Sequence, residues 1–153
     1  MMHELEDSIE MRTVVRTDAQ KLWQLVSEPG WFVNDGEIVE HRITMEGDLA
    51  TVTDPVHGTF RIRVVDIDPG YYVSYRWIGS SLGEGDGTED PVPVATLIEF
   101  RLNDHGDGVE LLVRESGITA LDLDADAHCR FLLDNREGWE IELRAVHEHL
   151  HAD

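Results

Sequence analysis

The chain contains few cysteines, few lysines and no long apolar run. Its one cysteine, Cys129, cannot form an internal disulfide, and this usage favours a reducing cytoplasm. No apolar stretch approaches the roughly 20 residues that a membrane-spanning helix needs. The first residues are acidic and lack the basic segment of a secretory signal peptide. We therefore expect a cytoplasmic protein that neither crosses nor enters a membrane.

Positive charge is also scarce. The chain has 12 basic residues against 32 acidic ones, a formal net charge of −20, and Lys21 is its only lysine. Such a field repels nucleic-acid phosphates and anionic lipid headgroups, so we expect no nucleic acid and no membrane surface as a partner. Because the acidic residues are spread along the whole chain, we interpret them as a solubilising surface rather than as a site.

The sequence shows no internal repeat and no sign of a second domain. An apolar fraction of 41% is typical of a globular protein, and a length of 153 residues is sufficient to bury a core. We expect one domain over residues 1–153.

Seven segments have the alternating or apolar pattern of β-strands. The first covers residues 9–15, and the others cover residues 37–43, 49–54, 58–67, 71–78, 92–102 and 109–116. Short turns rich in Gly, Pro, Asp and Asn separate the later segments, which indicates hairpins in an antiparallel sheet. The phases of the strands agree: one face is aromatic and apolar, and the opposite face mixes arginine with acidic residues suited to pairing in water.

Two short helical segments and one long helix complete the pattern. The short ones lie at residues 19–26 and 31–33, and residues 124–150 form the long amphipathic helix. A glycine in mid-helix costs roughly 1 kcal/mol relative to alanine, so Gly138 indicates a close approach of the backbone, with Trp139 laid across the sheet. The fold class is α+β: a curved antiparallel sheet of about seven strands, two short helices after the first strand, and a long C-terminal helix over the sheet.

Several segments, taken in their order and spacing, resemble one protein family. They are LWQLVSEP at 22–29 with WF at 31–32, VDIDP at 65–69 with YVSYRW at 72–77, ESGI at 115–118, and the Gly138-Trp139 pair with Leu143. Together they are similar to the helix-grip fold of the START/Bet v 1-like superfamily, and more narrowly to its AHSA1-like SRPBCC branch, related to the activator domain of the Hsp90 co-chaperone Aha1. The resemblance implies an internal cavity. Members bind lipids, hormones, polyketides or partner proteins, so it implies no single reaction.

Polar residues on an otherwise apolar inner face are the best indicators of a ligand. The strand phase places Thr13, Thr96 and Glu115 there. It places His41 there as well if Val39 and Ile43 face inward. A buried Glu115 needs a partner, and it would then serve as an acid or as a ligand anchor. The alternative is a position at a strand end that reaches solvent or a backbone amide. For His41 the alternative is a core or rim histidine.

Aromatic residues on the same face can line a pocket for an apolar or aromatic molecule. The candidates are Trp31, Phe32, Phe60, Tyr75, Trp77, Phe100, Phe131 and Trp139. Asn135, one turn before Trp139, is then a hydrogen-bond donor either in the pocket or to a loop carbonyl. The alternative is a filled core, since aromatics at these spacings occur in any packing of a helix on a sheet.

The sequence shows no cofactor or metal motif. His147 and His151 share a helix face, but no third ligand has suitable spacing. The acidic stretch at residues 83–90 lacks the ligand spacing of a calcium loop, and Asp124 with its acidic neighbours is typical of a helix cap. Phosphate loops and nucleophile elbows are absent. We therefore expect no cofactor and no metal, and assign no catalytic residue.

These features favour binding or sensing of a small, mostly apolar molecule in a cavity between the sheet and the C-terminal helix. One alternative is an enzyme of the same fold, a cyclase or hydratase in which Glu115 or His41 moves a proton. Another is an interaction protein with a filled core that binds a chaperone, another protein partner or a second copy of itself. The sequence leaves the identity of the ligand open.

Overall fold

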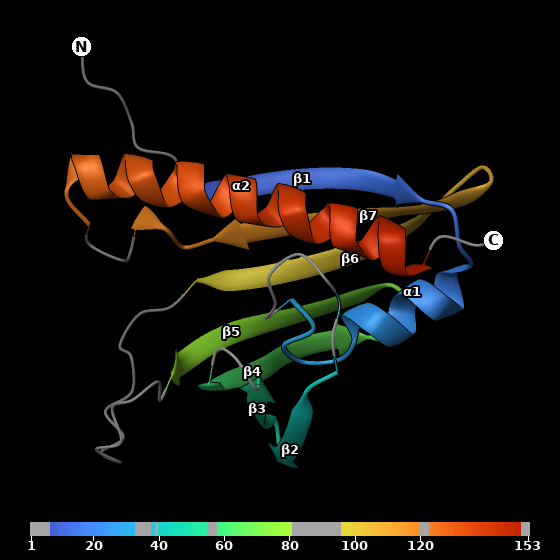
Figure 1. The fold of residues 1–153 in the computed structure, drawn as a ribbon, viewed down its shortest axis with the longest axis horizontal. Helices are drawn as coiled ribbons and strands as arrows, with labels where there is room; N and C mark the ends of the chain where they lie inside the picture. Colours follow the sequence, from blue (N-terminus) through green and yellow to red (C-terminus); the bar gives the residue numbers. More distant parts are fainter. Residues whose placement is uncertain are drawn as a thin grey trace.

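The computed structural model describes residues 7–32, 38, 40–54, 58–80, 96–119 and 123–150. In this part of the chain, seven strands form one antiparallel sheet in the order β1-β7-β6-β5-β4-β3-β2. The elements are β1 (Ser8–Val15), α1 (Ala19–Val26), β2 (Arg42–Glu46), β3 (Leu49–Asp54), β4 (Gly58–Asp68), β5 (Tyr72–Ser80), β6 (Leu97–His105), β7 (Gly108–Ser116) and α2 (Ala125–Leu150). Figure 1 shows α2 running across one face of the sheet, alongside β1. The predicted α+β class and antiparallel sheet are confirmed.

The two strands that come first in the chain lie at opposite edges of the sheet. β1 pairs with β7 at one edge, whereas β2 pairs with β3 at the other. The chain between them, which includes α1, therefore passes from one edge of the sheet to the other. Two register shifts between β4 and β5 act as bulges, and bulges bend the strands that carry them.

One short helix, rather than two, follows β1 in the described residues. The Asp18 side chain caps α1 by accepting a backbone hydrogen bond at 2.8 Å. Beyond the helix, Gly30 has a φ of +80°, and a Cβ there would lie 2.9 Å from the methyl groups of Val52. Residues 27–32 accordingly form turns, so the predicted second helix is wrong for this stretch. Residue 33 lies outside the described part of the chain.

The helix α2 begins within one residue of its predicted start, because Asp124 accepts a hydrogen bond from the Ala127 N–H at 2.8 Å. Its buried apolar side chains include Trp139, Leu143 and Val146. The prediction that Gly138 brings the backbone close to the sheet is wrong, because a Cβ added there would meet no heavy atom within 4 Å. A side chain at this position would therefore point into open space.

Two strand-phase predictions fail beside turns. The strand predicted at 37–43 is displaced, because β2 covers Arg42–Glu46 and pairs across the tight turn at Gly47. His41 therefore precedes the strand. Tyr71, the first residue of the strand predicted at 71–78, lies instead in the turn before β5 and is 65% exposed.

The core lies between the inner face of the sheet and the two helices. Its largest fully buried side chains include Trp31, Tyr75 and Phe100. The Phe100 ring centroid lies 5.2 Å from that of Trp31 and 6.0 Å from that of Tyr75. The Tyr75 hydroxyl donates a hydrogen bond to the Val26 carbonyl at 2.6 Å, which ties the sheet to α1, and burial raises the pKa of this hydroxyl.

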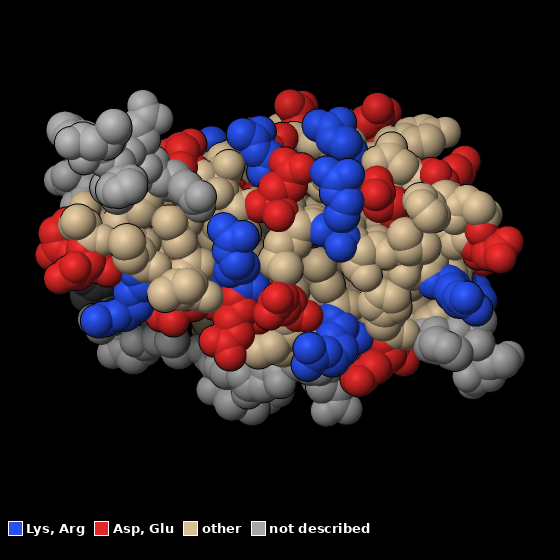
Figure 2. Space-filling view, turned by 90° about the horizontal axis from the view of Figure 1, so that it is seen from above, with Lys and Arg blue, Asp and Glu red and all other residues tan. Residues whose placement is uncertain are grey.

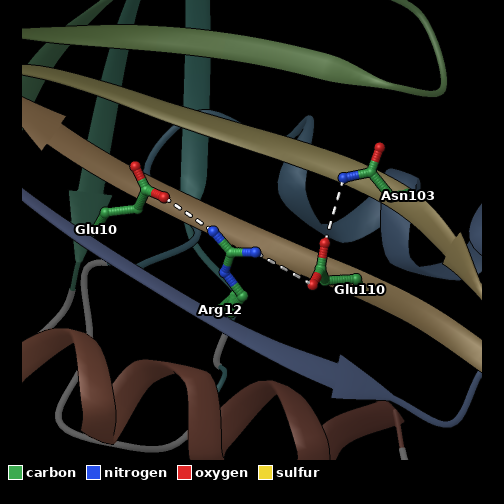
Figure 3. A network of polar contacts seen from close by, with 4 residues as sticks. All are labelled: Glu10, Arg12, Asn103 and Glu110. Atoms are coloured by element: carbon green, nitrogen blue, oxygen red, sulfur yellow. Dashed lines mark hydrogen bonds and ion pairs between the residues drawn. The ribbon is translucent and has the colours of Figure 1, made fainter.

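The opposite face of the sheet carries mixed charge, as its pattern predicted. Arg12 of β1 lies 3.0 Å from Glu10 and 3.8 Å from Glu110 of β7, and Asn103 of β6 donates to Glu110 at 3.4 Å (Figure 3). Figure 2 shows acidic and basic side chains interspersed over another view of the surface. Exposed pairs of this kind contribute under about 1 kcal/mol each. Neither described helix combines the length and apolar character needed to span a membrane.

Candidate functional site

A pocket of about 240 Å³ opens between α2 and the inner face of the sheet. Aromatic and apolar side chains form part of its wall, and carboxyl and amide groups form the rest. The described residues that line it are Phe32, Trp77, Ile98, Glu115, Asp134, Asn135, Gly138, Trp139 and Glu142. They come from β5, β6, β7, α2 and the turn after α1, so the complete pocket exists only in the folded domain.

Glu115 is the polar centre of this pocket and is only 3% exposed. Its Oε2 accepts a hydrogen bond from Thr96 Oγ1 at 2.6 Å. Its Oε1 accepts one from Asn135 Nδ2 at 3.0 Å and one from Trp139 Nε1 at 3.0 Å. Amide and indole N–H groups only donate, so the arrangement suits an ionised carboxylate. We call these four residues the Glu115 centre.

Strand register and helical periodicity bring the four residues together. β6 and β7 pair Ile98 with Glu115, and alternation directs both side chains to the inner face. Thr96 is two residues before Ile98 and therefore lies on the same side of the chain. Asn135 and Trp139 are four residues apart, so they share one face of α2. The Glu115 carboxylate thus links the sheet to the helix across one wall of the pocket.

Three of the predicted aromatic residues line the pocket: Phe32, Trp77 and Trp139. The Phe32 ring centroid lies 5.6 Å from that of Trp77 and 5.6 Å from that of Trp139. The two indole rings therefore share one aromatic neighbour, and an apolar surface forms beside the Glu115 centre.

The other predicted aromatic residues belong to the core. Trp31, Tyr75 and Phe100 are completely buried. Phe60 packs against the ring of Trp77 at 5.7 Å, and Phe131 is partly buried against the core. These five support the pocket wall or the sheet but are not among its described lining residues.

His41 is not among the described residues that line the pocket. Its side chain is completely buried, and Nε2 lies 3.1 Å from Asp54 Oδ1 at the end of β3. Burial raises the pKa of the nearby Glu28 carboxyl, and the attraction of His41 offsets part of that rise. We call His41 and Asp54, whose side chains face each other, the His41–Asp54 pair.

Sequence reasoning missed four lining residues, namely Ile98, Asp134, Gly138 and Glu142. Helical spacing was the available signal for three of them, because Asp134, Gly138 and Glu142 follow one another at intervals of four around Asn135 and Trp139. Glu142 is 7% exposed. A sequence gives little reason to expect this, because long carboxylate side chains are rarely buried.

The remaining predicted features lie elsewhere. His147 forms a hydrogen bond with Thr13 of β1 at 2.7 Å, which joins the end of α2 to the sheet. His151, the acidic stretch at 83–90 and residues 92–95 lie outside the described residues. Within the described part of the chain, no group of three or more His, Cys, Asp and Glu side chains is arranged to hold a metal ion.

Comparison with known proteins identifies the family. The model of the family described as Activator of Hsp90 ATPase homolog 1-like protein matches residues 16–151. No curated protein matches. The fold is similar to that of MLL2253 from Mesorhizobium loti, with a TM-score of 0.63 and 16% identity over 92% of this chain and 94% of that one.

Two further solved structures have the same fold. They are the Aha1 dimer from Colwellia psychrerythraea, with a TM-score of 0.58 and 18% identity over 94% of this chain and 95% of that one, and ChR145 from Cytophaga hutchinsonii, with a TM-score of 0.67 and 13% identity over 97% of each. At these identities the likeness shows the fold alone. Because the family match spans most of the sequence, the chain belongs to the family of Activator of Hsp90 ATPase homolog 1-like proteins.

Proposed function

We propose that this domain binds a small, mostly apolar molecule in the pocket between the sheet and α2. Phe32, Trp77 and Trp139 supply an apolar wall, and Glu115 supplies an oriented polar group. Small-molecule sites typically combine these two features. The pocket volume of about 240 Å³ is that of about eight water molecules, below the range typical for drug-sized ligands. The ligand is therefore small.

The observation that carries this proposal is the Glu115 carboxylate. Burying an ion costs several kcal/mol even in a relaxed protein, and an apolar residue of similar size avoids that cost. Three donors instead hold the carboxylate in a fixed direction at the pocket wall. A buried carboxylate is unusual in a protein core. One that is fixed by three hydrogen bonds beside open space is typical of a functional site.

The alternative function is a cyclase or hydratase in which Glu115 or His41 moves a proton, and of these two residues only Glu115 lines the described pocket. Because His41 is not among the described lining residues, acid–base chemistry in the pocket would depend on Glu115. In each of its three side-chain hydrogen bonds to described residues, the Glu115 carboxylate is the acceptor. That arrangement suits a fixed ligand anchor better than a group that must gain and lose a proton in every turnover.

A second candidate function is protein association through the outer side of α2. Leu133 is 69% exposed and Ile141 is 38% exposed on this helix. The Aha1 protein of similar fold is a dimer. Sedimentation of the wild type beside a Leu133→Asp/Ile141→Asp variant tests this candidate, because a dimer formed through these residues would become a monomer.

A solvatochromic apolar dye tests the binding proposal. We expect the native protein to bind it stoichiometrically, with a fluorescence titration that saturates. In Gly138→Leu the new side chain enters the open space beside Gly138, and we expect Kd to rise at least about 10-fold. Leu133→Ala, on the exposed surface of the same helix, is the matched control and should leave Kd unchanged.

Two results would overturn the proposal in favour of protein association. One is a native protein that excludes every such dye, and the other is a Gly138→Leu variant that binds as tightly as the wild type. Circular dichroism melting of each variant shows that it is folded. Native mass spectrometry of protein purified from its own host would then reveal a retained small molecule directly.

A further inference from the structure

The described wall of the pocket is acidic, and no Lys, Arg or His is among its lining residues. Glu115, Asp134 and Glu142 line it together with the three aromatic rings. All 12 Lys and Arg residues of the sequence fall within the described part of the chain, and none of them lines the pocket. The remaining segments contain no Lys or Arg that could supply a cation.

Two of the three carboxylates, Asp134 and Glu142, belong to α2, and the third, Glu115, belongs to β7. Asp134 is exposed and lies one turn before Gly138 on α2, whereas Glu142 lies one turn after it and is 7% exposed. The partners of Glu115 are a hydroxyl, an amide and an indole, which orient its charge without neutralising it. The pocket wall therefore carries carboxyl groups at one exposed and two buried positions, and a low dielectric strengthens the interactions of the buried ones.

The aromatic rings favour the same sign of ligand charge. The face of an indole or phenyl ring carries negative potential, and tryptophan is the best aromatic partner for an organic cation. Among the described lining residues, an anionic ligand would meet three carboxylates and no Lys, Arg or His. A bare metal ion has the right sign, but the described residues provide no group arranged to hold one.

We infer that the pocket takes a small organic ammonium ion, which is a protonated amine or a quaternary ammonium group on an aromatic or apolar body. The inference depends on the proposed binding function and adds the charge of the ligand to it. The ammonium group lies toward Glu115 and Glu142, and the body packs on Phe32, Trp77 and Trp139. Small carboxylic acids with the same body are rejected.

Three probes that share a phenylethyl body test the inference: 2-phenylethylamine, which is a cation at neutral pH, neutral 2-phenylethanol and anionic 3-phenylpropionate. Isothermal titration at low salt should rank their affinities in that order. We expect at least about a 10-fold preference for the amine over the alcohol. The preference should shrink as salt rises, because salt screens charge.

Variants of α2 locate the origin of that preference. Glu142→Gln should reduce the affinity for 2-phenylethylamine about 3- to 10-fold and leave 2-phenylethanol unaffected. Glu140→Gln changes the net charge equally but alters an exposed residue, so it is the matched control. Asp134→Asn, at an exposed position of the pocket lining, provides a second test if Glu142→Gln does not fold.

The outcomes separate the two claims. If the dye binds but the three probes bind equally, or the carboxylate binds most tightly, the charge inference fails and the binding proposal stands. If Glu140→Gln weakens the amine as much as Glu142→Gln, the preference comes from the whole protein and the inference fails. If the dye and all three probes fail to bind, both claims fail.

Discussion

Two buried carboxylates lie on the inner face of the same sheet in different surroundings. Asp54, on β3, faces His41 at 3.1 Å, and both side chains are almost completely enclosed. Glu115, on β7, is held by a hydroxyl, an amide and an indole and borders the pocket. Each buried acid therefore has partners, but partners of different chemistry.

This difference separates a carboxylate that is enclosed in the protein from one that borders open space. Asp54 faces the imidazole of His41, and neither side chain is among the described residues that line the pocket. The neutral donors around Glu115 fix its direction and leave its negative charge at the pocket. We therefore interpret the His41–Asp54 pair as structural and the Glu115 centre as the site, and the predictions below test this division.

The largest effect is expected at Trp139, which belongs to both the core and the site. Trp139→Ala should lower the free energy of unfolding by about 3–5 kcal/mol, as for other buried aromatic residues. Trp139→Phe keeps most of the ring and removes the N–H bonded to Glu115, so it should cost about 1.5–3 kcal/mol. Denaturant unfolding measures both, and a loss below about 1 kcal/mol for Trp139→Ala would show that the helix does not pack as described.

Breaking the His41–Asp54 pair should cost stability without affecting binding. Asp54→Ala should lower the free energy of unfolding by about 3 kcal/mol, the lower end of the range for broken buried pairs. Dye affinity should match that of the wild type. A double-mutant cycle with His41→Ala isolates the coupling between the two residues. Weaker dye binding in folded Asp54→Ala would contradict the division between structure and site.

The Glu115 centre should differ from the His41–Asp54 pair, because a change there should weaken binding as well as stability. Glu115→Gln places an amide NH₂ among groups that donate, so at least one donor loses its acceptor. The amine probe also loses a charged acceptor, so its affinity should fall by about 1–3 kcal/mol. Calorimetric titration measures this loss, and Glu110→Gln on the outer face of the same strand is the control. Unchanged affinity would mean that Glu115 is as structural as Asp54.

A smaller effect of opposite sign is expected at Gly138. Gly138→Ala should raise the free energy of unfolding by about 1 kcal/mol, because alanine is the better helix former and the added Cβ meets open space. The same methyl group reduces the pocket, so dye affinity should fall. Thermal melting and the dye titration together test this trade-off. A variant that loses stability would show that the space beside Gly138 is filled.

The smallest effect concerns Glu28, next to His41. Burial raises the pKa of its carboxyl in the folded protein, so the protonated form favours folding. The contribution of Glu28 to folding stability is complete at a pH below the ordinary carboxyl pKa. It is lost as the pH rises through the raised pKa of the folded protein. Glu28→Gln should therefore be more stable than the wild type at neutral pH, by under about 1 kcal/mol because the group is partly exposed. Melting curves of both proteins from acidic to neutral pH should show this difference in stability develop as the pH rises.

Much of the fold was predictable because strand alternation and helical periodicity are local properties of the sequence. They placed α1, α2 and most strands within a few residues of their observed bounds. The misplaced β2 shows the limit, since the turn at Gly47 rather than the apolar phase sets which residues pair. The exposure of Tyr71 has a similar origin.

The candidate site was predictable as a set of residues but not as a set of contacts. The sequence pattern assigned all four residues of the Glu115 centre to the inner side. Periodicity does not, however, fix how far α2 is rotated or shifted along the sheet. That placement decides which donors reach Glu115. It also decides that Gly138 faces open space, the reverse of the close approach that its position suggested.

The separation of β1 and β2 to opposite edges has a consequence for how the protein is made. The strands β2 to β7 are sequential neighbours and can form by local hairpins, but β1 pairs with β7, which follows it by about 100 residues. During synthesis β1 therefore emerges before the other strands and stays unpaired until β7 has been made. Glu115 lies opposite Ile9 in that late pairing, and α2 emerges later still. We expect the pocket to be the last part of the molecule to assemble, so that ligand binding reports a completely folded chain.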